Sequence, residues 1–323
     1  MTTEESTWTG ERLETFVFNE NTIEHLHRYA IATELAAGKT VLDIASGEGY
    51  GSNMMAAVAA EVVGVDIDAE TIADAQSKYI SANISFKTGS ADIIPCESNY
   101  FDLVVSFETI EHHDRHDEMM AEVKRVLKPG GILLMSSPDK LYYSDLTGYK
   151  NPYHVKELYQ HEFENLLAKY FTQTNYYRQK NFIGSLLVPH LDSTGNTNIK
   201  QYEGGYGGVS SNDIGAQFLV ALASDAELPH LKLSLFNGKE VVQKQIDDVR
   251  EQIMAFMQQQ AADYFGKMQK DAADQAELLK QQALTDIEQA RQQETERLKN
   301  TRDYRMGNLL LSPLRTIKKL LHA

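Results

Sequence analysis

Two acids and two glycines in the first quarter of the chain have the types and spacing of a nucleotide-type binding site. Asp43 lies in an apolar run, residues 41–44, which is followed by Gly47 and Gly49. Glycines lack a Cβ and let the backbone approach a ligand closely, and the amides that begin the next helix point into the same space. Asp66 ends the next apolar run, where an acid is placed to accept hydrogen bonds from a ribose diol.

The glycine turn distinguishes two classes of nucleotide ligand. A dinucleotide site needs Gly-x-Gly-x-x-Gly, with the pyrophosphate at the N-terminus of the helix. Here the turn reads Asp43-x-Ala45-x-Gly47-x-Gly49. A carboxylate at this place would repel a pyrophosphate, but it would suit a ligand with an ammonium group, such as the methionine end of S-adenosylmethionine (SAM).

The apolar runs of the chain predict the sheet that positions these residues. Short apolar runs are typical of buried strands, and helical segments separate the early ones. In an open α/β sheet the carboxyl ends of the parallel strands face the ligand crevice. The predicted strands are residues 41–44, 61–65, 84–87, 101–107, 132–136, 171–179 and 217–224.

Composition bounds the class of protein. The chain has 323 residues and a net charge of −15, which argues against a nucleic-acid partner. Its single cysteine, Cys96, excludes an intramolecular disulfide and fits a reducing compartment. Residues 1–8 are polar and are expected to be disordered, without a signal peptide. No apolar run is long enough to span a membrane, so we expect a cytoplasmic protein.

The last part of the chain differs in composition from the first. Residues 239–303 lack proline, and their apolar residues recur at threes and fours, which predicts a coiled coil of roughly 95 Å. An isolated charged helix or a disordered tail is the alternative. Residues 301–323 carry a net charge of +4. Their leucines and basic residues predict a short amphipathic segment, residues 304–323, that docks on a membrane or on a partner; a frayed terminus is the alternative.

Residues 9–235 resemble the class I SAM-dependent methyltransferases. The resemblance rests on residues 9–12, 24–29 and 42–52, and on the Leu-Lys-Pro-Gly-Gly pattern of 127–131 before a strand. It implies a Rossmann-like α/β fold over residues 9–238, with a seven-stranded sheet whose last strand is antiparallel. It also implies SAM as the cofactor, bound by Arg28, Asp43, Ala45, Gly47, Gly49, Asp66, Ile67, Ala91, Asp92 and Phe107.

Some of these roles have plainer alternatives. Asp92 would accept a hydrogen bond from the exocyclic amine of the adenine, or it could belong to a surface turn. Arg28 and the turn at residues 10–12 could close over the cofactor, or their helix could simply pack on the sheet. We read the long loop expected at residues 184–213 as a lid on the acceptor side.

Methyl transfer to a hydroxyl requires a base, and three side chains are candidates. His112 follows the fourth predicted strand, His154 lies in a tyrosine-rich segment (142–159), and Asp139 is the third choice. Histidine, with a pKa of about 6.5, is the natural base. We favour His154, because the tyrosines suit a polyhydroxylated acceptor; ordinary tyrosine packing and structural roles stay open. Residues 112–118 are dense in histidine and carboxylate, but a polar loop and helix start explain them better, so no metal is predicted.

The opening motifs and the coiled coil are similar to a subgroup that includes the chain-terminating methyltransferases of O-antigen biosynthesis. The similarity implies methylation of a sugar hydroxyl at the non-reducing end of a bacterial cell-surface polysaccharide. It also implies a homodimer or homotrimer, a glycosyltransferase or polymerase partner, and a peripheral place on the inner face of the cytoplasmic membrane. No kinase-like segment is present, so methylation of a phosphate is not expected. The alternatives are a methyltransferase for a sugar nucleotide or a quinone-type lipid, and a non-catalytic coiled-coil scaffold.

Overall fold

The computed structural model describes residues 15, 18–182, 184–189, 200–205, 208–213, 215 and 217–320. The chain divides into two compact units, Met1–Asp247 and Asp248–Ala323. The expected disordered segment at residues 1–8, and the turn at residues 9–12, lie outside the described residues.

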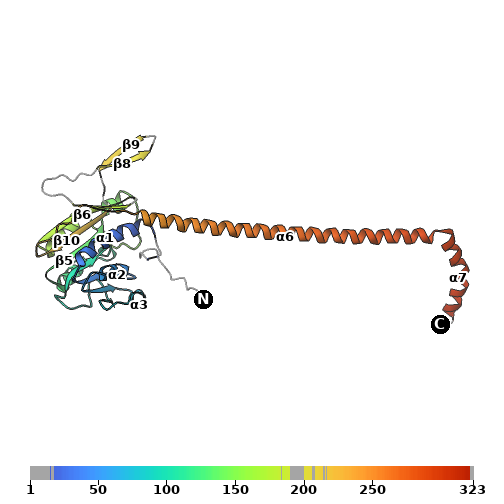
Figure 1. Ribbon diagram of the computed structural model, residues 1–323, viewed down its shortest axis with the longest axis horizontal. Coiled ribbons are helices and arrows are strands. Elements are labelled where there is room, and N and C mark those ends of the chain that lie inside the picture. Colours follow the sequence, from blue (N-terminus) through green and yellow to red (C-terminus); the bar gives the residue numbers. More distant parts are fainter. Residues whose placement is uncertain are drawn as a thin grey trace. The chain divides into compact units, whose positions relative to one another are not determined.

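The first unit is built on one large mixed sheet (Figure 1). Its strand order is β11-β7-β6-β10-β5-β4-β1-β2-β3. The run from β5 to β3 is parallel, and β10 lies antiparallel between β5 and β6. The strands are β1 (Thr40–Ile44), β2 (Glu61–Asp66), β3 (Ile84–Thr88), β4 (Phe101–Ser106), β5 (Leu127–Pro138), β6 (Gln173–Phe182), β7 (Gly184–Pro189), β10 (Phe218–Ser224) and β11 (Ser234–Phe236).

Helices cover both faces of this sheet because successive strand residues point to opposite sides. Leu42 and Ile44 of β1 pack in a core with α4 and α5, whereas Val41 packs in a second core with α1 and α2. A capping box of Asn19 and Thr22 begins α1. The helices are α1 (Glu20–Ala36), α2 (Tyr50–Ala56), α3 (Ala69–Lys78), α4 (His116–Val126) and α5 (Gln160–Tyr170), with the short turns η1 (Ile110–His112) and η2 (Leu141–Asp145).

Two expectations about this unit are wrong. The main sheet has nine strands rather than seven, because β7 pairs with β6 and β11 pairs with β7. Residues 184–213 are not one long loop either. Their first part is β7, and their last part contains a separate hairpin, β8 (Lys200–Gly205) paired with β9 (Gly208–Asp213). Strand β7 escaped the sequence analysis because its apolar residues, 186–188, form a run too short to stand out from a loop.

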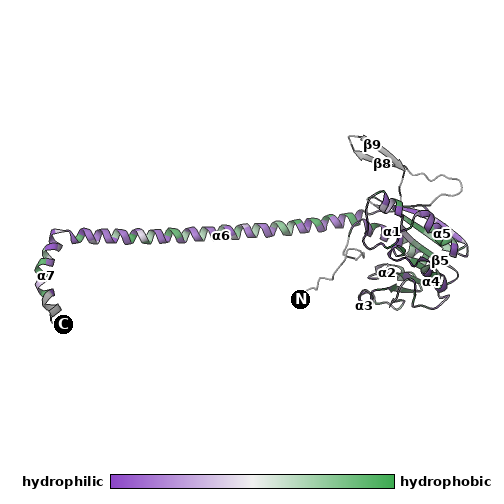
Figure 2. Ribbon diagram, turned by 180° about the vertical axis from the view of Figure 1, so that it is seen from behind, coloured by the Kyte–Doolittle hydropathy of each residue, from purple (hydrophilic) through white to green (hydrophobic). Residues whose placement is uncertain are grey.

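The second unit is helical. Helix α6 (Lys239–Lys299) begins in the first unit, where Val241 is buried, and it contains 61 residues, a length of about 90 Å. Figure 2 shows polar and apolar residues mixed along it. Helix α7 (Arg302–Leu320) follows a break at residues 300–301 and contains Pro313 in its interior. Within the described part of the chain, no helix is both long and apolar enough to cross a membrane.

Candidate active site

The glycine turn follows the carboxyl end of β1 and holds three left-handed residues. The φ angles are +57° at Ala45, +54° at Gly47 and +86° at Gly49. A Cβ at Gly47 would meet no other atom within 4 Å, so the backbone there borders open space, whereas one at Gly49 would lie 2.7 Å from the Phe86 ring. Ala45 is exposed and carries the cost of a left-handed backbone that glycine avoids. Position 45 therefore has the backbone conformation that glycine usually adopts, although its residue is alanine.

The two acids form hydrogen bonds around this turn, Asp66 with its backbone and Asp43 with the helices on either side of it in the chain. Asp66 accepts hydrogen bonds from the amides of Gly47 and Asp68, each at 3.0 Å. Asp43 is fully buried and accepts from Ser52 Oγ at 2.6 Å and from Tyr29 Oη at 3.2 Å. The roles of both acids toward a ligand stay predictions, and their roles within the turn are additional to them.

Burial gives Asp43 an unusual titration. Burial raises the pKa of its carboxyl to about 7 from 3.8, although hydrogen bonds from Ser52 and Tyr29 lower it. Between these two values the native state holds a proton that the unfolded chain releases. The stability from this proton is present below pH 3.8 and is lost as the pH rises through about 7.

We expect Asp43→Asn to remove this pH dependence. Between pH of about 4 and 7, the free energy of unfolding of the wild type should fall relative to the variant by on the order of 1 kcal/mol per pH unit. Urea unfolding across this range measures it. Asp74→Asn on the exposed surface of α3 is the control, and equal slopes for wild type and Asp43→Asn would contradict the expectation.

Two exposed isoleucines follow the second and third strands. Ile67, next to Asp66, is 71% exposed, and Ile93, next to Asp92, is 68% exposed. Asp92 is an ion-pair partner of Arg115 at 2.5 Å, and a hydrogen bond from Ser90 lowers the pKa of its carboxyl. Large exposed apolar side chains after strand ends are suited to contact the flat adenine ring of a cofactor. The position of Ile67 is compatible with this contact, which stays a prediction. Ala91 is half-buried and packs on the core.

Arg28 lies in a cage instead of an open cleft. It is the largest fully buried side chain among the described residues, at 1% exposure. Its Nη1 donates to Glu108 Oε1 and Gln179 Oε1, both at 3.1 Å, and its Nη2 lies 3.5 Å from Glu24 Oε1. The guanidinium also lies 5.7 Å from the centre of the Phe107 ring. Both Arg28 and Phe107 are enclosed here, and their contact with a cofactor stays a prediction.

The structure brings together the two histidines that the sequence analysis proposed. Their ring centroids lie 5.1 Å apart, edge to face. His112 ends η1, directly after β4, and its Nδ1 lies 3.2 Å from the Tyr153 carbonyl. His154 stacks on Tyr143 at 5.3 Å, and its Nδ1 lies 2.6 Å from Glu157 Oε1. Because β4 pairs in parallel with β1, the pair lies at the same edge of the sheet as the glycine turn.

Asp139 has a different place. It is buried at the end of β5, where its Oδ1 accepts from the Leu141 amide at 3.1 Å, and burial raises the pKa of its carboxyl. The structure therefore gives it a part in holding η2, and its role as a base stays a prediction.

Sequence reasoning missed two carboxyls near the histidine pair. Glu157 is the partner of His154, three residues along the chain. Glu111 directly precedes His112 and is 1% exposed, which nothing in its polar surroundings in the sequence indicated. The pair Glu111-His112 was visible in the sequence, but the burial of Glu111 is a tertiary feature. The amides of residues 155 and 156, far along the chain, both donate to the Glu111 carbonyl.

Comparison with known proteins gives the class of the first unit. Residues 42–135 match the family described as a methyltransferase domain. A probable S-adenosylmethionine-dependent methyltransferase of Mycolicibacterium smegmatis is 34% identical over 162 residues, which are 49% of this chain and 62% of that protein. Another protein of that description, from Mycobacterium tuberculosis, is 31% identical over 164 residues, 50% of this chain and 59% of the relative.

A third relative is named for a lipid. Phthiotriol/phenolphthiotriol dimycocerosates methyltransferase 1 of Mycobacterium ulcerans is 33% identical over 118 residues, 36% of this chain and 43% of that protein. The chain thus spans less than two thirds of the length of each of these relatives.

The residues of the glycine turn fit the cofactor that these comparisons imply. The open backbone at Gly47 and the exposed Ala45 give access to the helix N-terminus, and Asp66 and Ile67 offer an acid and an apolar surface beside it. When bound, SAM supplies an electrophilic methyl group. The family match over residues 42–135, the relatives and this geometry agree, and together they support a SAM-dependent methyltransferase domain within the first unit.

Proposed function

We propose that the protein is an O-methyltransferase that acts on a sugar hydroxyl of a bacterial cell-surface glycan, at the non-reducing end, as a chain-termination step. One observation carries this proposal. His112 and His154 lie against each other beside a tyrosine-rich segment, at the sheet edge that also holds the glycine turn. A hydroxyl held there can be activated by imidazole and aligned with the cofactor.

The tyrosines support a polyhydroxylated acceptor. Tyr143 stacks on His154, and Tyr149 packs edge to face on Tyr143 at 5.7 Å. Tyr149 is 51% exposed and Tyr153 is 41% exposed. Tyrosine offers a ring face for the apolar side of a sugar and a hydroxyl for its polar rim.

A lipid-like small molecule is the second candidate substrate. Leu146 and Val155, in the same segment as the tyrosines, are both well exposed and would suit an apolar acceptor. A relative named for a lipid methyltransferase points the same way. A glycan explains α6 better, because a diffusible substrate needs no spacer.

The second unit supports an assembly role. Apolar side chains recur along α6 and are exposed, a pattern that favours association with a second or third copy of the helix. We therefore propose a homo-oligomeric coiled coil that sets a distance between the methyltransferase and a glycan-polymerising partner. The exposed apolar residues include Ile246, Val249, Ile253, Met257, Tyr264, Met268, Leu279 and Ile287.

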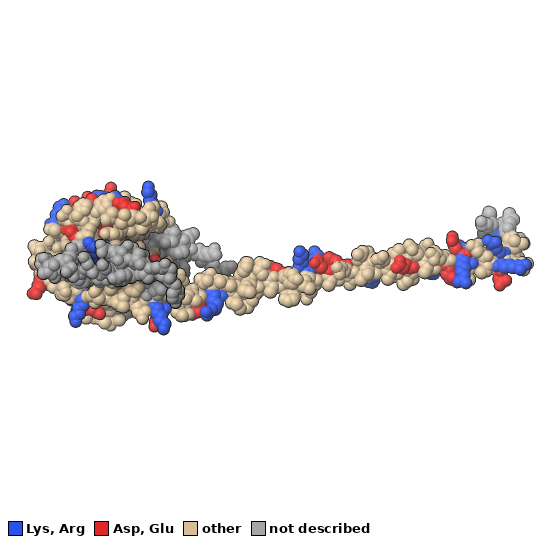
Figure 3. Space-filling model, turned by 90° about the horizontal axis from the view of Figure 1, so that it is seen from above, with Lys and Arg blue, Asp and Glu red and all other residues tan. Residues whose placement is uncertain are grey.

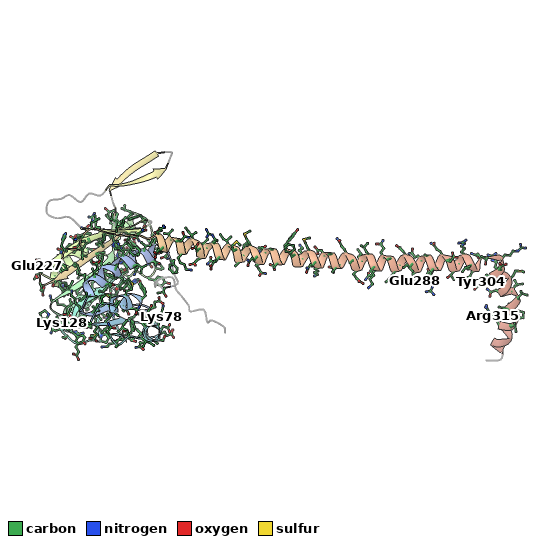
Figure 4. The ribbon with its side chains drawn as sticks, in the orientation of Figure 1. Lys78, Lys128, Glu227, Glu288, Tyr304 and Arg315 are labelled. Atoms are coloured by element: carbon green, nitrogen blue, oxygen red, sulfur yellow. The ribbon has the colours of Figure 1, made fainter. Side chains whose placement is uncertain are left out.

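Helix α7 suits a surface with negative charge. Its basic residues whose side chains the structure describes are Arg302, Arg305 and Arg315. Blue and red side chains lie together near this end of the chain in Figure 3, and Figure 4 labels Tyr304 and Arg315 on the helix. Leu309 and Leu310 are strongly exposed. We expect removal of residues 301–323 to release the protein from membranes while activity on short acceptors stays. Vesicle co-sedimentation measures this, and a truncated protein that still sediments would contradict it.

The glycan proposal is tested by mass spectrometry of surface polysaccharide from cells with and without the protein. The expected result is loss of one methyl group at the non-reducing end, together with longer chains. An unchanged polysaccharide would exclude the glycan and leave the small-molecule substrate.

A further inference from the structure

The site contains a buried carboxyl group whose environment is unexplained. Glu111 is 1% exposed, and neither of its side-chain oxygens has a hydrogen-bond partner among the described residues. A buried carboxylate without a partner costs several kcal/mol, so such groups are normally paired, bound to a metal or kept protonated. Arg28 does not fill this role, because its Nη1 donates to Glu108 and Gln179 and its Nη2 donates to Glu24.

The two imidazoles converge on this carboxyl. One ligand atom each from Glu111, His112 and His154 lies within 4.8 Å of the others. In the part of the chain that the structure describes, no other group of three such side chains meets this condition. Donor atoms around one tetrahedral ion lie about 3.4 Å apart, so small side-chain rotations would close the group on a cation.

The hydrogen bonds of both rings prepare them as ligands. Nδ1 of His154 faces the Glu157 carboxylate and Nδ1 of His112 faces the Tyr153 carbonyl. Both partners are acceptors, so each Nδ1 carries the proton and each Nε2 carries the lone pair. A carboxylate or carbonyl behind the imidazole is the usual outer partner of a metal-binding histidine. Asn151 Nδ2 lies 3.0 Å from Nε2 of His154, and this amide must turn aside when the lone pair binds an ion.

We propose that Glu111, His112 and His154 bind one divalent transition-metal ion, with Mn²⁺ and Zn²⁺ as the best fits. Two imidazoles with one carboxylate suit first-row ions, whereas Mg²⁺ and Ca²⁺ prefer oxygen alone. Glu108 is not assigned as a ligand, because Arg28 and Ser136 engage its Oε1.

This site also specifies how the histidine pair works, and that part rests on the proposed function. The ion would take an oxygen of the acceptor as a further ligand and lower the pKa of its hydroxyl. In the transfer an O–CH₃ bond forms, the S–CH₃ bond breaks, and the hydroxyl proton is released to water. Each lone pair then serves as a ligand and not as a general base.

The binding experiment uses the untagged full-length chain, stripped of metal with a chelator. Mn²⁺ binding is followed by the EPR signal of the free ion, and Zn²⁺ binding by competition with a chromogenic chelator. We expect one ion per chain. Glu111→Gln and His154→Asn should weaken binding by about 100-fold, and Glu157→Gln by about 10-fold.

Glu118→Gln is the matched control, since it makes the same change at an exposed position of α4 and should bind as the wild type does. Circular dichroism without metal shows whether each variant is folded, and Glu111→Gln should fold because it removes a buried ionisable group. Absence of stoichiometric Mn²⁺ and Zn²⁺ binding, or wild-type binding by folded Glu111→Gln, would overturn the proposal. Neither SAM nor an acceptor is needed, so failure of the glycan proposal leaves this result unaffected.

Discussion

His154→Asn lowers kcat/KM for methyl transfer by about 10²–10⁴-fold, the range that loss of a group activating the acceptor hydroxyl produces. Its ring stacks on Tyr143, touches His112 and is oriented by Glu157. Asparagine keeps a polar group there but removes the imidazole lone pair. The measurement is transfer of labelled methyl from SAM to an acceptor glycan, with cofactor affinity measured separately.

His161→Asn is the control for this variant, because His161 is an exposed histidine of α5 and should keep wild-type activity. His154→Asn with activity within a few-fold of the wild type would exclude any role for His154 in the chemistry. A chelator distinguishes the two roles of the imidazole. Reversible loss of wild-type activity indicates a metal ligand, and unchanged wild-type activity beside an inactive variant indicates a base.

Arg28→Met destabilises the first unit by about 3–5 kcal/mol, because it leaves the Glu108 carboxylate and the buried Gln179 amide oxygen without their donor. Glu108 is the carboxylate most affected. Glu24 contributes less, because burial raises its pKa to about 8 even beside Arg28. Methionine fills much of the arginine volume, so the loss reports on charge more than on packing. Urea unfolding at neutral pH measures the change.

The control for Arg28→Met is Lys128→Met. Lys128 pairs with Asp102 at 2.9 Å, but the side chains are 40% and 35% exposed, and such a surface pair contributes about 1 kcal/mol or less. Figure 4 shows Lys128 at the surface of the first unit. Equal losses in the two variants would show that the cage around Arg28 has no special part in stability.

The features that the sequence predicted well are local in the chain. The Asp43–Gly49 turn, its strand and the helix after it lie within a few residues of each other, and their spacing alone indicated the cofactor class. The parallel strands followed from apolar runs bounded by helices. The cofactor and the methyltransferase class are confirmed, and the individual binding contacts stay predictions.

What the sequence could not give depends on contacts between distant residues. Arg28 donates a hydrogen bond to Gln179, which lies 151 residues away in the chain. The sequence alone could therefore not distinguish an exposed arginine that contacts the cofactor from a buried one. His112 and His154 could each be proposed, but nothing in their spacing showed that they touch. Strand β11 is three residues long and is defined by its pairing with β7. A segment this short shows no hydrophobic periodicity from which a strand could be predicted.

The amides of Val155 and Lys156 both donate to one carbonyl, that of Glu111, at 2.8 and 3.0 Å. The tyrosine-rich segment (142–159) and the turn after β4 therefore form a single structural part, although about forty residues separate them in the chain. A chimera that exchanges acceptor specificity between two relatives must move both stretches together. Grafting the tyrosine-rich segment alone would place a foreign backbone against the Glu111 carbonyl. The histidine of the segment, His154, would then be displaced.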